Sequence, residues 1–214
     1  VPLCVVAPCG PGLGLGGHAA EATASILAAI PGLTVLCASA PEDAGAWLRA
    51  AVEHAAAEGP TVLLLPRSLL LAAPQGPMTA RLPHEPGAAH RVRDGARLTV
   101  FSWGEALPVA LAAVEQAKVD AAVVDVGCLA PLDLPTLEAE AKATGRLVIV
   151  HAGPRRGGAG AELAAWLADS AILYLDAPVV RVTGADPPLH RSDEAAAVPD
   201  PEQVAEALTR VASF

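Results

Sequence analysis

The sequence predicts an α/β protein built from two parallel-sheet units, and three observations support that prediction. Short apolar segments alternate with helical patterns, which requires crossover connections and therefore favours parallel sheets. These segments are apolar at consecutive positions, as in sheets that are covered on both faces. One Pro- and Gly-rich stretch without clear periodicity, residues 72–95, interrupts the alternation. We therefore expect α/β units at residues 1–71 and 96–214, joined by an interdomain linker at 72–95.

The first unit contains three apolar segments that we expect to be strands and two Ala-rich segments that we expect to be helices. Pro41 suits the first turn of a helix because its missing N–H needs no partner there, and Glu42 and Asp43 favour the positive end of the helix dipole. The expected strands are Leu3–Ala7, Leu33–Ala38 and Thr61–Leu65, and the expected helices are Glu21–Ile30 and Pro41–Ala57. Because these strands are apolar throughout, we expect them to be buried.

The second unit repeats the alternation over about 120 residues, a normal size for one domain. Asp133 is a plausible N-cap, and Asp200 with Pro201 provides a cap and a first-turn proline for the last helix. The expected strands are Arg97–Ser102, Ala121–Val126, Leu147–His151 and Pro178–Val182, and the expected helices are Glu105–Lys118, Leu134–Thr144, Ala159–Asp169 and Pro201–Ala212.

The composition excludes several classes of protein. The chain is 53% hydrophobic, which is enough to bury a core and excludes wholesale disorder. Its net charge is −9, from 23 acidic and 14 basic residues, and 3% of its residues are aromatic. Nucleic-acid binding needs clustered Lys and Arg or a platform of aromatic rings, so we expect no nucleic-acid partner. No apolar stretch is long enough for a transmembrane helix, so we expect no membrane partner and a cytoplasmic protein.

The cysteines and most histidines give no sign of a metal site. Cys4, Cys9, Cys37 and Cys128 show no C-x-x-C spacing, and free thiols in a reducing compartment are the expected state. His54, His84, His90 and His190 also lack the spacing of metal ligands.

A glycine motif, Gly12-x-Gly14-x-x-Gly17, lies between an expected strand and an expected helix. It matches the dinucleotide fingerprint, which also needs an acid at the end of the next strand to hold the ribose. That strand ends in Ala38-Ser39 without an acid, so a flexible or close-packed glycine loop is favoured over NAD binding.

A second turn, Arg155-Arg156-Gly157-Gly158, lies between a strand end and a helix start. Backbone N–H groups and the helix dipole can hold an anion at such a place, and two arginines strengthen that interpretation. A tight turn with exposed arginines is the alternative. His151 ends the preceding strand, at the sheet edge where ligands of parallel α/β proteins bind. It can move protons there, or it can be structural.

Several motifs in the second half occur together in one known family. They are the run Gly145–His151, Pro154-Arg155-x-Gly157-Gly158-x-Gly160-Ala161-Glu162, Leu175–Gly184 with Asp186, Pro199–Glu202, and upstream Val124-Asp125 with Leu129-x-Pro131-Leu132-Asp133. Residues ~95–214 thereby resemble the C-terminal, transketolase-like domain of the beta subunit of thiamine-diphosphate-dependent 2-oxoacid dehydrogenases (pyruvate and branched-chain types). Residues 1–71 resemble, less strongly, the later half of that subunit's pyrimidine-binding domain, through motifs such as Ile30-Pro31-Gly32-Leu33.

The resemblance implies a beta-type subunit that acts with an alpha subunit and a second copy of itself. Thiamine diphosphate and Mg²⁺ would lie at the interface with the alpha subunit, and the complex would decarboxylate a 2-oxoacid and acylate a lipoyl group. His18 matches the family's active-site histidine by type, although its neighbouring Ser and Gln are alanines here. Phe214 matches by position the surface on which the lipoyl acyltransferase docks; a frayed helix end is the alternative.

Two departures from the family leave a second hypothesis open. The family's cofactor-activating glutamate belongs to the first half of the pyrimidine-binding domain, to which nothing in this sequence corresponds, so we expect no activity from this chain alone. The family's His-Glu-Ala-Pro reads His151-Ala152-Gly153-Pro154 here, without the carboxylate. The alternative to an enzyme subunit is therefore a non-catalytic relative that serves as a dimerisation or docking module. A transketolase or deoxyxylulose-synthase type of chain is a related possibility, since it shares the glycine turn.

Overall fold

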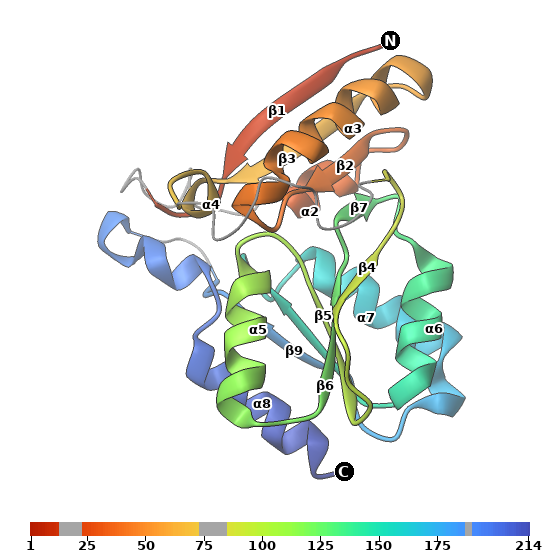
Figure 1. Cartoon of the computed structure of the whole chain (residues 1–214), viewed down its shortest axis with the longest axis vertical. Helices are drawn as coiled ribbons and strands as arrows, with labels where there is room; N and C mark the ends of the chain where they lie inside the picture. The colour runs from red at the N-terminus through yellow and green to blue at the C-terminus, as the bar shows by residue number, and fades with distance from the viewer. Residues whose placement is uncertain (13–22, 73–84, 187–189) are drawn as a thin grey trace.

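The computed structural model describes residues 1–12, 23–72, 85–186 and 190–214. It contains two sheets arranged one above the other along the long axis of the molecule, with the N-terminus at one end and the C-terminus at the other (Figure 1). Within the described ranges no helix combines the length and the apolarity that crossing a bilayer requires.

The first sheet has the strand order β1-β3-β2-β7. Its first three strands are parallel, and the fourth is antiparallel to β2 and comes from the second half of the chain. The strands are β1 (Cys4–Cys9), β2 (Thr34–Cys37), β3 (Thr61–Pro66) and β7 (Cys128–Ala130). Its helices are α2 (Ala24–Ala28), α3 (Ala44–Ala57), which follows a 3-10 turn at Pro41–Asp43, and α4 (Arg67–Leu70).

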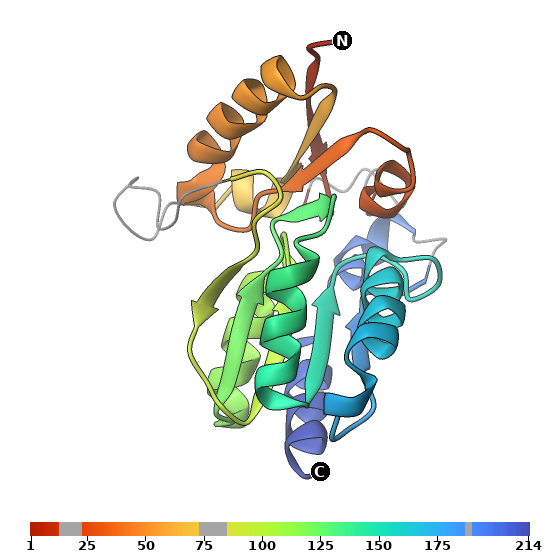
Figure 2. The same ribbon diagram turned by 90° about the vertical axis from the view of Figure 1, so that its right-hand side faces the viewer.

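The second sheet has the order β4-β6-β5-β8-β9 and is parallel except for the edge strand β4. Helices α5 and α8 cover one face, and α6 and α7 cover the other (Figures 1 and 2). The strands are β4 (His90–Arg93), β5 (Leu98–Ser102), β6 (Ala121–Asp125), β8 (Leu147–His151) and β9 (Val180–Thr183). The helices are α5 (Ala106–Ala117), α6 (Leu134–Thr144), α7 (Ala159–Ser170) and α8 (Pro201–Ala212), with short 3-10 turns at Ile172–Tyr174 and Arg191–Ala197.

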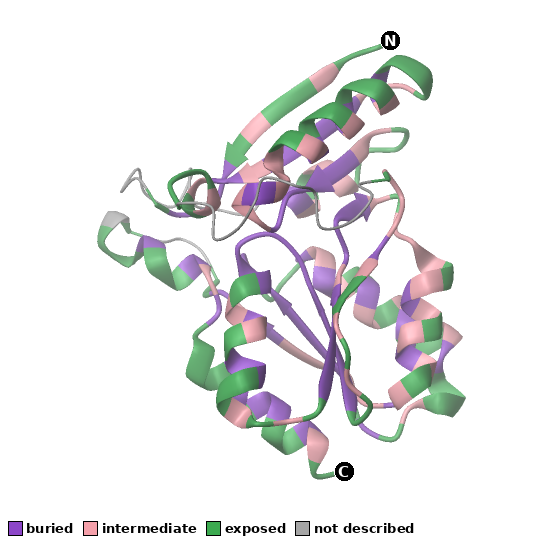
Figure 3. Cartoon of the chain, viewed as in Figure 1, coloured by how far each residue is buried: buried purple, intermediate pink, exposed green. Residues whose placement is uncertain are grey.

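The central strands of the second sheet form the core because both of their faces are covered (Figure 3). Leu98 and Val100 of β5 pack towards α5 and α8, whereas Phe101 packs towards α6 and α7. All three side chains are fully buried, and each such burial contributes on the order of 2 kcal/mol. This two-sided burial explains why these strands are apolar at consecutive positions.

The α/β class and the predominance of parallel strands are confirmed. Both expected N-caps are also confirmed: the Asp133 carboxylate accepts from the N–H of Thr136 at 3.2 Å, and the Asp200 carboxylate accepts from the N–H of Glu202 at 2.9 Å. Because these caps fix where a helix begins, α6 and α8 have the expected bounds.

The expectation that Leu3–Ala7 is a buried strand was wrong. Strand β1 forms at Cys4–Cys9, but it lies at the edge of the described sheet, and Val5 and Val6 remain 42% and 43% exposed. An apolar segment predicts a buried strand, but burial also requires a neighbouring element on each side. Strand β1 has β3 on one side and no described strand on the other.

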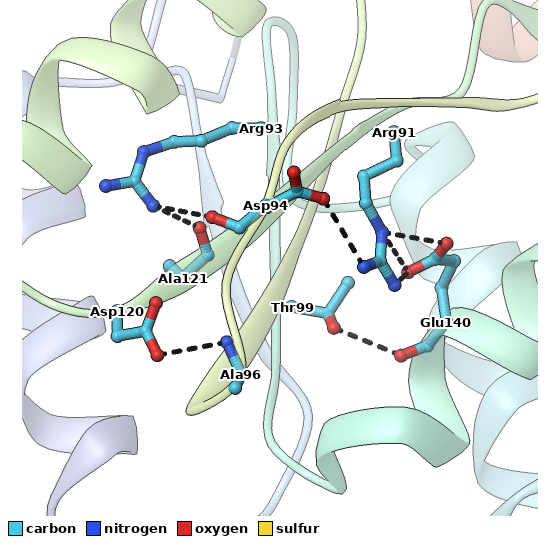
Figure 4. A network of polar contacts seen from close by, with 8 residues as sticks. All are labelled: Arg91, Arg93, Asp94, Ala96, Thr99, Asp120, Ala121 and Glu140. Atoms are coloured by element: carbon cyan, nitrogen blue, oxygen red, sulfur yellow. Dashed lines mark hydrogen bonds and ion pairs between the residues drawn. The ribbon is translucent and has the colours of Figure 1, made fainter.

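Two edge strands were not expected. Strand β4 lies inside the segment expected to be a linker. The Nε–H of Arg91 holds it to α6 by a bond shared between the two carboxylate oxygens of Glu140, each at 3.1 Å (Figure 4). Arg93 holds its other end to α5 through Glu115 at 3.1 Å. Strand β7 is three residues long and comes from the second half of the chain, but it pairs with β2 of the first sheet, a contact that no local pattern reveals.

Candidate functional site

The carboxyl ends of the two sheets meet at the junction between them. Ser39 follows β2, and its Oγ–H donates to Oδ1 of Asp125, the last residue of β6, at 2.9 Å. The same Oγ accepts from the N–H of Gly104, just beyond β5, at 2.9 Å. Parallel α/β sheets bind ligands at the carboxyl ends of their strands, so this junction is the candidate functional site.

Glu105 places a buried carboxyl group at the junction. It is the N-cap residue of α5, is 8% exposed, and lies against Gly10 at the end of β1. A Cβ atom on Gly10 would lie only 2.4 Å from Oε1 of Glu105, and Gly10 has a φ of 71°, so glycine is required at this position. Burial raises the pKa of the Glu105 carboxyl, because the charged form loses hydration.

Arg67 and Cys9 lie beside this carboxyl group. Arg67 donates from Nη1 to the carbonyl oxygen of Gly10 at 2.8 Å, which fixes the backbone at the start of the glycine-rich segment. Burial, and secondly the charge of Glu105, raise the pKa of the Cys9 thiol well above its ordinary value, and Arg67 only partly offsets them.

The cysteines of the site are protonated structural residues. Burial raises the pKa of the Cys37 thiol well above its ordinary value and that of Cys128 to about 11. Since the thiolate is the reactive form, neither is a nucleophile near neutral pH. All four cysteines are free, as expected. In the described ranges no group of three or more His, Cys, Asp and Glu side chains is arranged to hold a metal ion.

His151 is held in the interior rather than presented to a ligand. It is 1% exposed, and its ring stacks on Trp103 with centroids 5.0 Å apart. Its Nδ1 lies 2.8 Å from the carbonyl oxygen of Ala152, and a carbonyl can only accept, so Nδ1 carries the proton. Burial lowers the imidazole pKa. The geometry thus favours the structural interpretation of this residue over proton transfer.

Gly158, which ends the second turn, and Gly160 in α7 make room for this imidazole. A Cβ atom would lie 2.6 Å from Nε2 if added at Gly160, and 2.8 Å from Cε1 if added at Gly158. The packing of α7 on His151 therefore requires glycine at positions 158 and 160, and a φ of 65° favours glycine at position 157. No anion is needed to explain these glycines.

The two arginines of this turn point to different places. Arg156 is exposed and lies 3.8 Å from the carboxylate of Asp186. Arg155 donates from Nη1 to the carbonyl oxygen of Arg181 on β9 at 2.7 Å. At the helix start itself, the N–H of Ala159 already donates to the Oγ of Ser25 in α2, at 2.9 Å. The side chain of Arg155 is thus directed towards β9, and the N–H of Ala159 at the start of α7 already has a partner in Ser25.

The remaining expected site residues are His18 and Phe214. His18 lies outside the described residues. Phe214 is 59% exposed at the C-terminus, the end of the molecule farthest from the first sheet (Figure 1). Its proposed docking role therefore concerns a surface separate from the junction.

Two cavities flank the junction, and their polar residues were missed by the sequence analysis. One of about 430 Å³ is bordered by Ser39 and Asp125, and one of about 410 Å³ by Ser25, Trp103 and Gly158. Ser39 and Asp125 each stand at or just after the end of a strand, which is the signal that could have identified them. Trp103 follows β5 directly and Glu105 comes two residues later, but the contact of Glu105 with Gly10 depends on the other sheet.

The comparisons with known proteins agree with this architecture. Residues 87–204 match the family model described as transketolase, C-terminal domain, and residues 1–72 match the one described as transketolase, pyrimidine binding domain. The 2-oxoisovalerate dehydrogenase subunit beta of Pseudomonas aeruginosa is 34% identical over 99% of this chain and 64% of its own length. The pyruvate dehydrogenase E1 component subunit beta of Leifsonia xyli is 31% identical over 100% of this chain and 64% of its own length.

One solved structure shows the same fold. It is described as a split gene transketolase, inactive beta4 tetramer, and superposes with a TM-score of 0.76 at 22% identity, covering 98% of this chain and 66% of that one. The chain spans less than two thirds of the length of the two dehydrogenase beta subunits named above. It belongs to the transketolase family, and the relatives that it resembles over nearly its whole length are beta subunits of 2-oxoisovalerate and pyruvate dehydrogenases.

Proposed function

We propose that the chain is the beta-type part of the decarboxylating component of a 2-oxoacid dehydrogenase. In this role it acts with an alpha subunit in the oxidative decarboxylation of a 2-oxoacid and in acyl transfer to a lipoyl group. Family membership over nearly the whole chain supports the general assignment. The alpha partner, a second copy of the chain and the lipoyl acyltransferase are parts of the proposal.

The observation that carries the proposal is the uncovered edge of the first sheet. Leu3, just before β1, is 51% exposed, and Val5 and Val6 on that strand are 42% and 43% exposed. Among the described residues β1 pairs with β3 on one side only, so apolar side chains lie beside a strand edge that no described strand covers. Such an edge invites pairing with another strand. We propose that the further third of the length found in the relatives, in the same polypeptide or in a separate chain, covers β1 and completes the pyrimidine binding domain.

The junction offers one side of a cofactor site. Glu105 fills the space beside Gly10, whereas Gly12 brings backbone without a side chain close to the end of β1, and we propose that a flat ring approaches there. The described residues supply no cluster of metal ligands, and in the proposal the diphosphate and Mg²⁺ are held by the alpha subunit. When bound, thiamine diphosphate would supply the carbanion and the electron sink for decarboxylation. His18 is proposed to hold or move a proton beside it.

The second candidate is a non-catalytic relative that serves as a dimerisation or docking module. Alanine follows His151 here, so the chain lacks the carboxylate that the resembling family carries at that position, and the imidazole bonds to the backbone carbonyl of Ala152. On this hypothesis the exposed C-terminus around Phe214 is the docking surface.

Native mass spectrometry of the protein purified from its own cells separates the two candidates. A heteromeric assembly that carries an alpha-type chain and thiamine diphosphate supports the enzyme subunit, and a homodimer without cofactor contradicts it. In the purified assembly, His18→Ala should abolish most 2-oxoacid decarboxylation, while His190→Ala, a control at an exposed histidine, should leave it unchanged. Equal activities of the two variants would remove His18 from the proposed active site.

A further inference from the structure

A groove lined by three arginines runs between strand β9 and helix α8, away from the junction. It has a volume of about 330 Å³. Arg155 comes from the turn after β8, Arg181 from β9 and Arg210 from α8, and the groove is completed by Thr183, Gln203 and Glu206. Three segments that are distant in sequence therefore direct basic side chains to one place.

Two of these arginines hold each other in fixed positions. Arg155 donates from Nη1 to the carbonyl oxygen of Arg181 at 2.7 Å, and Arg181 donates from Nη1 to the carbonyl oxygen of Arg155 at 2.8 Å. The backbone N–H of Arg155 also donates to Asp186 at 2.8 Å. Each guanidinium has five N–H donors and uses one in this exchange, so most of the donors remain available in a preorganised arrangement.

The three guanidinium groups are not neutralised by carboxylates. In the described part of the chain, none of Arg155, Arg181 and Arg210 has a carboxylate oxygen within 4.0 Å, whereas Arg91, Arg93, Arg146 and Arg156 each have one (Figure 4 for Arg91). The whole chain carries a net charge of −9, so a groove with three arginines and one carboxylate, Glu206, is unusual for it. A bound anion would relieve the repulsion between the arginines.

The hydrogen bonding along β9 favours a small anion over an added peptide strand as the occupant of the groove. A peptide that extended the sheet beyond β9 would need free backbone acceptors along that edge, but the carbonyl oxygen of Arg181 already accepts from Arg155. The planar fork of arginine matches the oxygens of a phosphate, and Gln203 provides a further amide donor in the same groove. We propose that this groove binds a phosphate group, either as free phosphate or as the monoester of a small metabolite, through Arg155, Arg181 and Arg210.

Isothermal titration of the full chain tests this proposal, with inorganic phosphate and glycerol 3-phosphate as separate probes. We expect saturable binding in the millimolar range or tighter, and Arg210→Gln and Arg181→Gln should each weaken it by about tenfold. Tighter binding of glycerol 3-phosphate would identify an ester as the ligand, and equal binding would show that the phosphate group alone is recognised. Arg210 is exposed, so its variant should fold even if the Arg181 variant does not.

Two charge-matched variants distinguish a local site from a general effect of charge. Arg49→Gln, on the exposed surface of α3, removes the same charge outside the groove and should leave the affinity unchanged. Glu206→Gln removes the carboxylate from the groove and should tighten binding roughly threefold. The proposal is overturned if neither probe binds saturably, if Arg49→Gln weakens binding as much as Arg210→Gln, or if Glu206→Gln leaves the affinity unchanged.

Discussion

The imidazole of His151 lies parallel to the indole of Trp103, with ring centroids 5.0 Å apart and an interplanar angle of 7°. Trp103 follows β5 and His151 ends β8, and these two strands are parallel neighbours in the second sheet. The stack thus joins two segments at the carboxyl edge of that sheet and forms the surface on which the first turn of α7 packs. The stack holds the ends of β5 and β8 and the start of α7 in place beside the candidate site.

The packing of α7 on this stack predicts a large effect of a small substitution. In Gly160→Ala the new Cβ atom would lie 2.5 Å from Cδ2 of His151, so the helix or the ring must move. We expect the free energy of unfolding, measured by urea denaturation, to fall by about 1–3 kcal/mol. Gly45→Ala in α3 is the control, since nothing lies within 4 Å of its added Cβ, and it should stabilise the protein by up to about 1 kcal/mol. Similar effects of the two substitutions would contradict the close packing.

The buried imidazole also predicts a pH dependence of stability. Burial lowers the pKa of folded His151 below its ordinary value of 6.5, so the unfolded chain takes up a proton at a higher pH than the folded chain. The contribution to stability is complete above the unfolded pKa, and it is lost progressively as the pH falls from there towards the folded pKa. The slope should reach about 1.4 kcal/mol per pH unit within that window.

The variant His151→Phe isolates this contribution, because phenylalanine preserves a ring against Trp103 and does not titrate. Urea denaturation at several pH values between neutrality and pH 5 should give a smaller loss of stability for the variant than for the wild type. If the two curves run parallel, another group is responsible for the acid sensitivity.

A third prediction concerns the hydroxyl group that joins the two sheets. Ser39→Ala removes the donor to the half-buried Asp125 and the acceptor for the buried N–H of Gly104. Leaving that N–H unsatisfied should lower the free energy of unfolding by about 1–3 kcal/mol in urea denaturation. Ser213→Ala at the exposed end of α8 removes a single bond to the Arg210 carbonyl and should change stability by less than about 0.5 kcal/mol. A loss at Ser39 as small as that at Ser213 would show that the junction does not depend on this contact.

Helices and central strands could be predicted from the sequence because their signals are local. Asp133 and Asp200 fix the first turns of α6 and α8 through bonds to nearby N–H groups, and the apolar run of β8 is bounded by a glycine turn on each side. Strand β7 could not be predicted, since its partner β2 lies about ninety residues earlier and the three residues Cys128–Ala130 carry no pattern of their own.

The candidate site was predicted less well, and the reason is geometric. The position of His151 at a strand end indicated chemistry, but the direction of its ring depends on the space left by Gly158 and Gly160. Glu105 and Ser39 make their contacts only because the two sheets meet end to end. The pattern of apolar residues along the sequence does not predict how the sheets are placed. The family resemblance supplied the function class, which no local pattern reached.

The uncovered strand β1 gives the last prediction. Val6 is 43% exposed at the sheet edge, so a charge there should discourage pairing with strands from other molecules at little cost to the fold. For the 214-residue chain alone, Val6→Lys should slow the growth of light scattering on warming severalfold relative to the wild type. Val52→Lys places the same charge on α3, at a valine that is 51% exposed and lies outside any strand, and it should leave the rate unchanged. Equal rates for Val6→Lys and the wild type would show that β1 is not the surface through which these chains associate.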